Sequence, residues 1–203
     1  MGIVEVLGLA GSVSLLAGWR LYLAVFATGL AMRLGALPLP DHLQALDALA
    51  NPWVMGVAAV AALVEFFADK VMWLDSAWDA VHTVVRPVGG AMLALAIVDP
   101  GDPAMQAIAF LLGGGAAFAA HGGKAGARAV VNASPEPFSN MVVSTAEDVA
   151  SAGLLWLAYA HPYVAGGIAL VLLALTAWLL LVARRMLRRL LGRRRSEPLP
   201  PGG

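Results

Sequence analysis

The chain has 203 residues, of which 60% are hydrophobic and only 13% charged, whereas a soluble domain carries about 25% charged residues. This much apolar surface cannot be buried in one small soluble core, because a chain of this size keeps much of its surface exposed. The formal net charge is zero, and the absence of cysteine excludes disulfides, thiolate catalysis and cysteine-ligated metals. The composition therefore predicts an integral membrane protein.

Apolar segments recur along the chain and approach the roughly 17–25 residues that a helix needs to cross a bilayer. Prolines and Asp/Gly turns separate them. We expect an all-α polytopic membrane protein with about six transmembrane helices. No basic residue precedes the first segment, which predicts a retained helix and not a cleaved signal peptide. The expected spans are 6–32, 53–68, 87–98 (extended if 82–86 belong to the same helix), 103–120, 141–159 and 162–183.

The positive charges set the expected orientation. With the amino terminus in the cytoplasm and six spans, eleven Lys and Arg residues lie on the cytoplasmic side and only Arg33 lies outside. Cytoplasmic loops carry an excess of Lys and Arg. We therefore expect a multi-pass protein of a bacterial-type inner membrane with both termini in the cytoplasm. Residues 1–185 form the expected single membrane domain, and 186–203 a basic and then Pro/Gly-rich cytoplasmic tail.

The expected partners follow from the same pattern. Apolar spans require a lipid bilayer. The seven arginines between Arg184 and Arg195 predict contact with anionic lipid headgroups, and nucleic-acid binding is not expected. Association with a second copy of the chain is left open.

The two halves of the chain, 1–100 and 101–185, share three short patterns that suggest an internal repeat. Because each half holds three helices, an odd number, the second half would be inserted upside down, as in many secondary transporters. The alternative is a chance resemblance between Gly- and Ala-rich helices. The matched residues are Arg20 with Lys124, Asp69 with Asp148, and the glycine pairs 89–90 with 166–167.

Two acidic stripes interrupt the apolar spans. Glu65 and Asp69 are four residues apart, so a helix places both carboxylates on one face. Carboxylates in a spanning helix are costly, face the protein interior and often mark an ion or proton path. The alternative is an interfacial helix whose acids lie in water, with Lys70 and Arg86 as partners. The second stripe, in the fifth span, consists of Asn140, Ser144, Glu147, Asp148 and Ser151. Its alternative is interhelical hydrogen bonding that only fixes packing.

Basic residues supply candidate partners for these acids. Arg20 lies near the middle of the first span, and Lys124 and Arg128 follow His121 at helical spacing near the end of the fourth. They could pair with the acids or hold an anionic headgroup or substrate. The alternatives are a structural ion pair, snorkelling of Arg20 to the interface, and a plain topology signal.

The sequence lacks the GxxxxGK[ST], HExxH and GxSxG motifs. We therefore expect no organic cofactor and do not expect an enzyme. A bound cation would suit the oxygen ligands of the acidic stripes, and the identity of any metal is left open.

Four blocks of the sequence stand out: Glu-Phe-Phe-Ala-Asp-Lys at 65–70, Asp-Ser-x-Trp-Asp at 75–79, His-Thr-x-x-Arg-Pro at 82–87 and Ser-Pro-Glu-Pro-Phe-Ser-Asn at 134–140. With them, residues 5–180 resemble the domain-of-unknown-function 4126 family of integral membrane proteins. The resemblance implies a membrane fold and no particular activity. The first block is also similar to the Glu-x-Gly-Asp-Lys signature of manganese and calcium exporters with inverted repeats. Its spacing is one residue longer and lacks the glycine, so no ligand role carries over.

Three hypotheses for the function remain open. The first is a transporter or channel-like protein for a small ion, cation or proton, with an acidic central site. The second is a lipid-phosphate binding protein, flippase or membrane enzyme that uses Arg20, Lys124, Arg128 and Arg86. The third is a non-catalytic membrane scaffold. An acid-lined centre favours the first, a basic pocket open to lipid the second, and fully paired charges the third.

Overall fold

The computed structural model describes residues 3–35, 47–99, 101–132 and 137–195. Within these ranges the chain forms six long helices and no strand, so the expected all-α fold is confirmed. The helices are α1 (Ile3–Arg33), α2 (Pro52–Ala68), α3 (Met72–Ile97), α4 (Pro103–Asn132), α5 (Pro137–Ala160) and α6 (Pro162–Arg195).

Prolines and short polar side chains define where these helices begin. Proline is the first residue of α2, α4, α5 and α6, a position where its missing N–H costs nothing. Asn51 caps α2 by accepting a hydrogen bond from the Trp53 N–H at 2.9 Å. Asp102 caps α4 by accepting from the N–H groups of Ala104 and Met105, both at 3.0 Å. These helix starts match the breaks that the sequence predicts.

Two boundaries differ from the prediction. The third helix begins at Met72 and continues through Pro87, so residues 72–86 and the expected span 87–98 form one helix. Proline is tolerated inside membrane helices because neighbouring groups satisfy the freed backbone. The last helix continues to Arg195, so residues 186–195 of the expected tail are helical, while 196–203 lie outside the described residues.

The helices make this a multi-pass membrane protein. Five of them, α1 and α3–α6, are long and apolar enough to cross a bilayer, by length and composition. α2 has 17 residues, which is about 25 Å at 1.5 Å per residue. Many large apolar side chains lie on the outer surface. Leu111 and Leu170, for example, are each 70% exposed. Such a surface suits lipid and not water.

The first helix does not run straight. Its two segments, 3–19 and 21–33, meet at Arg20, whose backbone is non-helical (φ −143°, ψ 69°). The first segment runs alongside α4: Val6 packs against the cluster that contains Ala109, and the Lys124 ammonium donates to the Trp19 carbonyl at 3.3 Å. The segment therefore runs in the same direction as α4.

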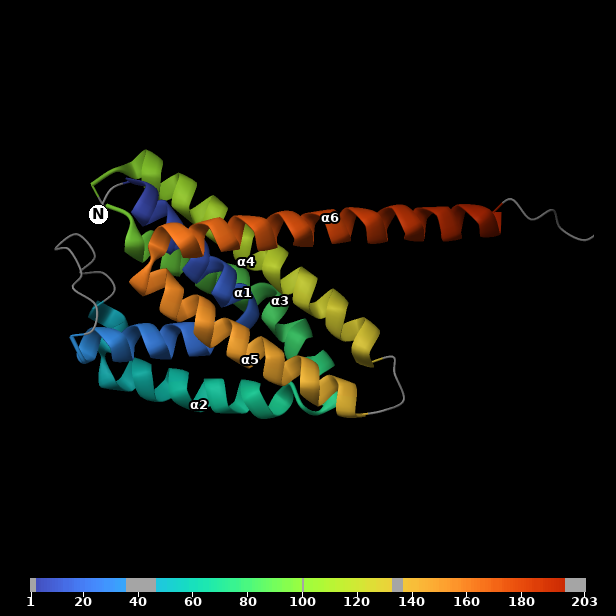
Figure 1. Ribbon diagram of the computed structural model, residues 1–203, viewed down its shortest axis with the longest axis horizontal. Helices are drawn as coiled ribbons and strands as arrows, with labels where there is room; N and C mark the ends of the chain where they lie inside the picture. Colours follow the sequence, from blue (N-terminus) through green and yellow to red (C-terminus); the bar gives the residue numbers. More distant parts are fainter. Residues whose placement is uncertain (1–2, 36–46, 100, 133–136, 196–203) are drawn as a thin grey trace, which may run out of the picture.

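The second segment returns to the end from which α1 started (Figure 1). Gly8, near the start of α1, lies against Pro162. Thr28, near its end, hydrogen bonds through its hydroxyl to the hydroxyl of Tyr159. Because Tyr159 and Pro162 flank the same turn between α5 and α6, both ends of α1 lie at one end of the bundle. The α1 helix is thus a hairpin with Arg20 at its tip.

This arrangement bears on the expected orientation of the two termini in the membrane, which stays a prediction. If α1 crossed the membrane, both termini would lie on one side. Instead, the start of α1 and the end of α6 lie at opposite ends of the bundle (Figure 1). The prediction assumed that a 31-residue apolar helix is continuous. The membrane in which the protein resides stays a prediction.

Small residues allow α1 to lie at the centre of the bundle. A Cβ on Gly18 would overlap the backbone carbonyl of Ala117 in α4, and a Cβ on Gly166 of α6 would overlap the backbone of Gly8. Glycine at such positions lets helix backbones approach closely. These contacts hold the α1 hairpin against α4 and α6.

Candidate functional site

Charged side chains from several helices converge on Asp69, which follows α2. Its Oδ2 atom lies 2.5 Å from Arg20 Nη1, 2.7 Å from Lys124 Nζ and 3.2 Å from Arg128 Nη2. All four side chains are almost completely buried, with 0–3% exposure. Three cations therefore share one carboxylate oxygen at the tip of the α1 hairpin.

Helix α5 supplies the second layer of acids. Glu147 Oε2 lies 3.4 Å from Arg128 Nη2 and 3.7 Å from Lys124 Nζ. Asp148 binds Arg20 Nη2 through Oδ1 at 2.7 Å, and its Oδ2 lies 3.4 Å from Lys70 Nζ. The group of Arg20, Asp69, Lys124, Arg128, Glu147 and Asp148 is called the Asp69 cluster below.

The Asp69 cluster has one partly open side. The side chains of Lys70, Glu147 and Asp148 are 19%, 18% and 23% exposed. Lys70 also donates to the Ser144 hydroxyl at 3.3 Å. This edge connects the buried cations to the surface beside the α2–α3 turn.

A second buried network surrounds Arg86 of α3. Its Nη2 lies 2.6 Å from Glu65 Oε1, and its Nη1 lies 3.2 Å from Asp79 Oδ1. Nη1 also donates to His121 Nδ1 at 2.7 Å, so His121 carries its proton on Nε2, which donates to the Asp79 carbonyl at 3.1 Å. Arg86 is fully buried. Arg86 with Glu65, Asp79 and His121 is called the Arg86 network.

The break in α1 is stabilised by these same cations. Arg86 Nη1 donates to the Gly18 carbonyl and Lys124 Nζ to the Trp19 carbonyl, both at 3.3 Å. The last carbonyls of a helix have no partner within it and form the negative end of its dipole. Both basic side chains therefore satisfy the end of the first segment, which connects the hairpin to the charged groups.

The structure brings together most of the residues that the sequence predicts for the site. Arg20, positioned at the break, bridges α2 and α5 by contacting Asp69 and Asp148. Glu65 belongs instead to the Arg86 network. The side chain of Asn140 lies outside the described residues. The remaining predicted residues, Ser144, Lys124, Arg128 and Glu147, lie in or beside the Asp69 cluster.

Sequence reasoning gave too little weight to Arg86 and His121. The expected third span is 87–98 unless residues 82–86 belong to the same helix, which leaves Arg86 at a boundary. The available signal was helical spacing, because Asp79 and Arg86 are seven residues apart and seven residues make two helical turns.

Acids and bases are paired throughout the two groups. With Lys70 and Asp75, which contact the Asp69 cluster, the ion pairs among the described residues join five cations to six acids. The described residues contain no group of three or more His, Asp or Glu side chains arranged to hold a metal ion. The cations are Arg20, Lys70, Arg86, Lys124 and Arg128; the acids are Glu65, Asp69, Asp75, Asp79, Glu147 and Asp148.

The inverted repeat stays a prediction. Its matched residues pair reciprocally: Lys124 of the second half binds Asp69 of the first at 2.7 Å, and Arg20 of the first binds Asp148 of the second at 2.7 Å. A two-fold axis between the halves would produce such pairing. One feature departs from it, since α1 folds back at Arg20 whereas α4 is a single helix through Lys124.

Comparison with known proteins places the chain in a family. Neither the curated proteins nor the solved structures contain a match. A family model described as a domain of unknown function (DUF4126) matches residues 7–181. The matched range includes the α1 hairpin, the Asp69 cluster and the Arg86 network. The chain therefore belongs to the DUF4126 family.

Proposed function

We propose that the protein transports a small cation, the proton being the best candidate, through the Asp69 cluster. The observation that carries this proposal is the sharing of Asp69 Oδ2 by three buried cations at the tip of a broken helix. Broken helices form the ion and substrate sites of many secondary transporters. Irregular backbone at membrane depth is tolerated only where protein or a water-filled cavity surrounds it.

The energetics of burial support a functional role. Removing two charges from water costs several kcal/mol per ion, and well-packed apolar residues are often as stable as a buried ion pair or more so. Stability alone therefore does not require Arg20, Lys124 and Arg128 to be buried at 1–3% side-chain exposure. Ionisable groups inside a membrane domain commonly mark ion or proton paths.

The ligand set favours a proton over a metal ion. The described part of the chain offers no cluster of three His, Asp or Glu side chains with the geometry of a metal site. Asp148, 23% exposed and bound to Arg20 at 2.7 Å, is the most exposed acid of the Asp69 cluster.

Protonation of Asp148 would weaken its hold on Arg20. Arg20 is the residue at which α1 changes direction. Loss of one carboxylate partner leaves Arg20 bound to Asp69 at 2.5 Å, so the tip of the hairpin can shift with the protonation state. In this proposal, proton binding at Asp148 changes the position of the α1 backbone at Arg20.

We expect Asp148→Asn to reduce proton flux by about tenfold or more, because an amide cannot release a proton and positioned acid–base groups contribute roughly 10²–10⁴-fold to proton transfer. The purified protein is reconstituted into liposomes that contain a pH-sensitive dye, and a potassium diffusion potential drives proton entry. Asp99→Asn is the matched control, since Asp99 is an exposed acid after α3.

Wild-type flux equal to that of protein-free liposomes would refute the proposal. So would an Asp148→Asn variant that elutes as folded protein and transports protons at the wild-type rate.

The ion pairs within the Asp69 cluster and the Arg86 network also favour a second candidate, a membrane scaffold without transport. In a scaffold, Arg20 and its partners would serve only to hold α1, α2 and α5 together. The variant above separates the two, because a scaffold predicts a loss of stability in Asp148→Asn with no flux in either protein. A basic pocket for lipid phosphate is less favoured, since acids already engage Lys124 and Arg128.

A further inference from the structure

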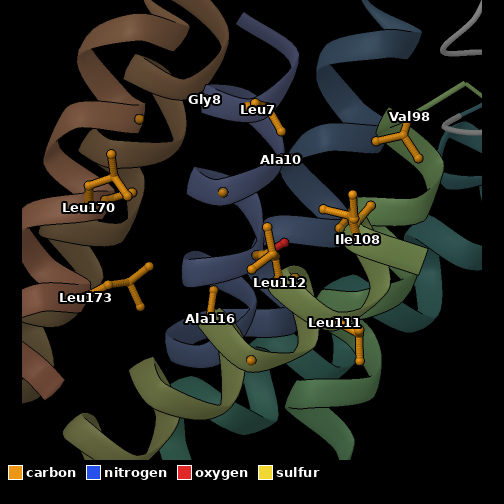
Figure 2. Close-up of a pocket in the computed structure, with 18 of the residues that line it drawn as sticks. Leu7, Gly8, Ala10, Val98, Ile108, Leu111, Leu112, Ala116, Leu170 and Leu173 are labelled. Atoms are coloured by element: carbon orange, nitrogen blue, oxygen red, sulfur yellow. The ribbon is translucent and has the colours of Figure 1, made fainter. Parts of the chain in front are cut away.

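The protein has an apolar groove, and none of its described lining residues belongs to α5. It has a volume of about 760 Å³ and is bounded by α1, α4 and α6. Figure 2 shows Leu170 and Leu173 of α6 at the left, Ala116 and Leu112 of α4 to their right, and Leu7 of α1 above them.

The lining offers an occupant almost no hydrogen bonds. Only Ser14 and Tyr163 among the described lining residues have polar side chains. The Ser14 hydroxyl already donates to the Gly90 carbonyl at 3.2 Å. The groove therefore suits a hydrocarbon chain and offers little to a polar solute.

The face of α6 that lines the groove leads directly to arginines. Eighteen residues make five turns of 3.6 residues, so a residue and the one eighteen positions later share a face. Ala177, the last groove residue on α6, precedes Arg184 by seven residues, about 10 Å along the axis. The matched pairs are Gly166 with Arg184, Gly167 with Arg185, and Leu170 with Arg188, and all three arginines are exposed.

We propose that this groove binds one acyl chain of an anionic phospholipid, whose phosphate is held by Arg184, Arg185 and Arg188. Charge complementarity and the shared helix face select this occupant over a neutral lipid. Basic residues at a membrane surface contribute to the binding of anionic headgroups, and the groove adds a site for the chain. This inference is independent of proton transport.

Three glycines allow the groove to be filled without disturbing the fold. A Cβ on Gly11, Gly115 or Gly167 would meet no atom within 4 Å, and all three line the groove. Gly115→Leu therefore places a side chain in the space proposed for the lipid. Gly153→Leu in α5 is its matched control, because a Cβ there also meets nothing within 4 Å and Gly153 does not line the groove.

The test is native mass spectrometry of the full chain released from nanodiscs of phosphatidylglycerol mixed with phosphatidylcholine. We expect the wild type to retain one phosphatidylglycerol in preference to phosphatidylcholine. Each Arg→Gln change at 184, 185 or 188 should weaken that retention by roughly fivefold. Gly115→Leu should abolish retention, whereas Gly153→Leu and Arg33→Gln, a charge loss at the other end of the bundle, should not change it.

Equal retention of the two lipids by the wild type would overturn the proposal. Retention unaffected by Gly115→Leu would overturn the placement of the chain in the groove. A dimer that forms in the wild type and is lost in Gly115→Leu, with no bound lipid, would show that a second copy occupies the groove instead.

Discussion

Replacing Arg86 with methionine is expected to lower the free energy of unfolding by about 3–5 kcal/mol, the cost of leaving a buried charge without its partner. Arg86 is 0% exposed and binds Glu65, which is 1% exposed, at 2.6 Å. Among the described residues, Arg86 is the ion-pair partner of Glu65 and the second carboxylate oxygen, Oε2, has no hydrogen bond, so the variant removes the described cation that Glu65 binds. Reversible unfolding in mixed micelles, followed by circular dichroism, measures the loss.

A double variant provides the control. Glu65→Leu combined with Arg86→Met removes both charges, and replacing a buried pair by apolar residues is often neutral or stabilising. We expect the double variant to recover most of the stability lost in Arg86→Met. Two results would contradict the geometry of the Arg86 network. One is a free energy of unfolding that falls by less than about 1 kcal/mol in Arg86→Met. The other is a double variant whose free energy of unfolding falls by the sum of the losses in the two single variants.

Asp69→Asn is expected to cost about 3–5 kcal/mol, because it removes the carboxylate shared by Arg20, Lys124 and Arg128. Burial alone would raise the pKa of Asp69, but the charges of Lys124 and Arg20 outweigh it and hold its pKa below the usual value. This contribution to stability is therefore complete above the unfolded pKa of about 3.9 and is lost as the pH falls through the lower, folded-state pKa.

The measurement is the unfolding free energy as a function of pH. The wild type should lose stability on acidification below about pH 4, and Asp69→Asn should show a flatter curve over that range. Asp102→Asn, in which an exposed helix cap is replaced by another good cap, serves as control. A wild-type curve and an Asp69→Asn curve of the same shape would show that Asp69 carries no depressed pKa.

Much of the fold follows from local sequence signals. Four helices begin with a proline, a position that suits proline because the N–H it lacks would have no partner within the helix. These prolines are Pro52, Pro103, Pro137 and Pro162. Apolar composition and segment length identify the membrane helices. The acidic stripes also predict inward-facing carboxylates, because facing lipid would cost too much.

The α1 hairpin could not be predicted in the same way. No proline lies near Arg20, and the carbonyls freed at Gly18 and Trp19 are satisfied by Arg86 and Lys124, which are 68 and 105 residues away in the chain. The break thus depends on tertiary partners. The pairing of Asp69 with three cations depends on the same break, so the acidic site expected from α2 and α5 is an ion-pair cluster.

The hairpin at Arg20 underlies both the Asp69 cluster and the lipid groove, and the sides of the membrane reached by the two chain ends test it most directly. The chain has no cysteine, so Val4→Cys, Asp99→Cys and Met186→Cys can each be labelled alone with a membrane-impermeant maleimide in cells and in inverted vesicles. The fold predicts that Val4→Cys and Asp99→Cys react from one face and Met186→Cys only from the other, the cytoplasmic one. Labelling of Val4→Cys and Met186→Cys from the same face would contradict it and show that α1 crosses the membrane.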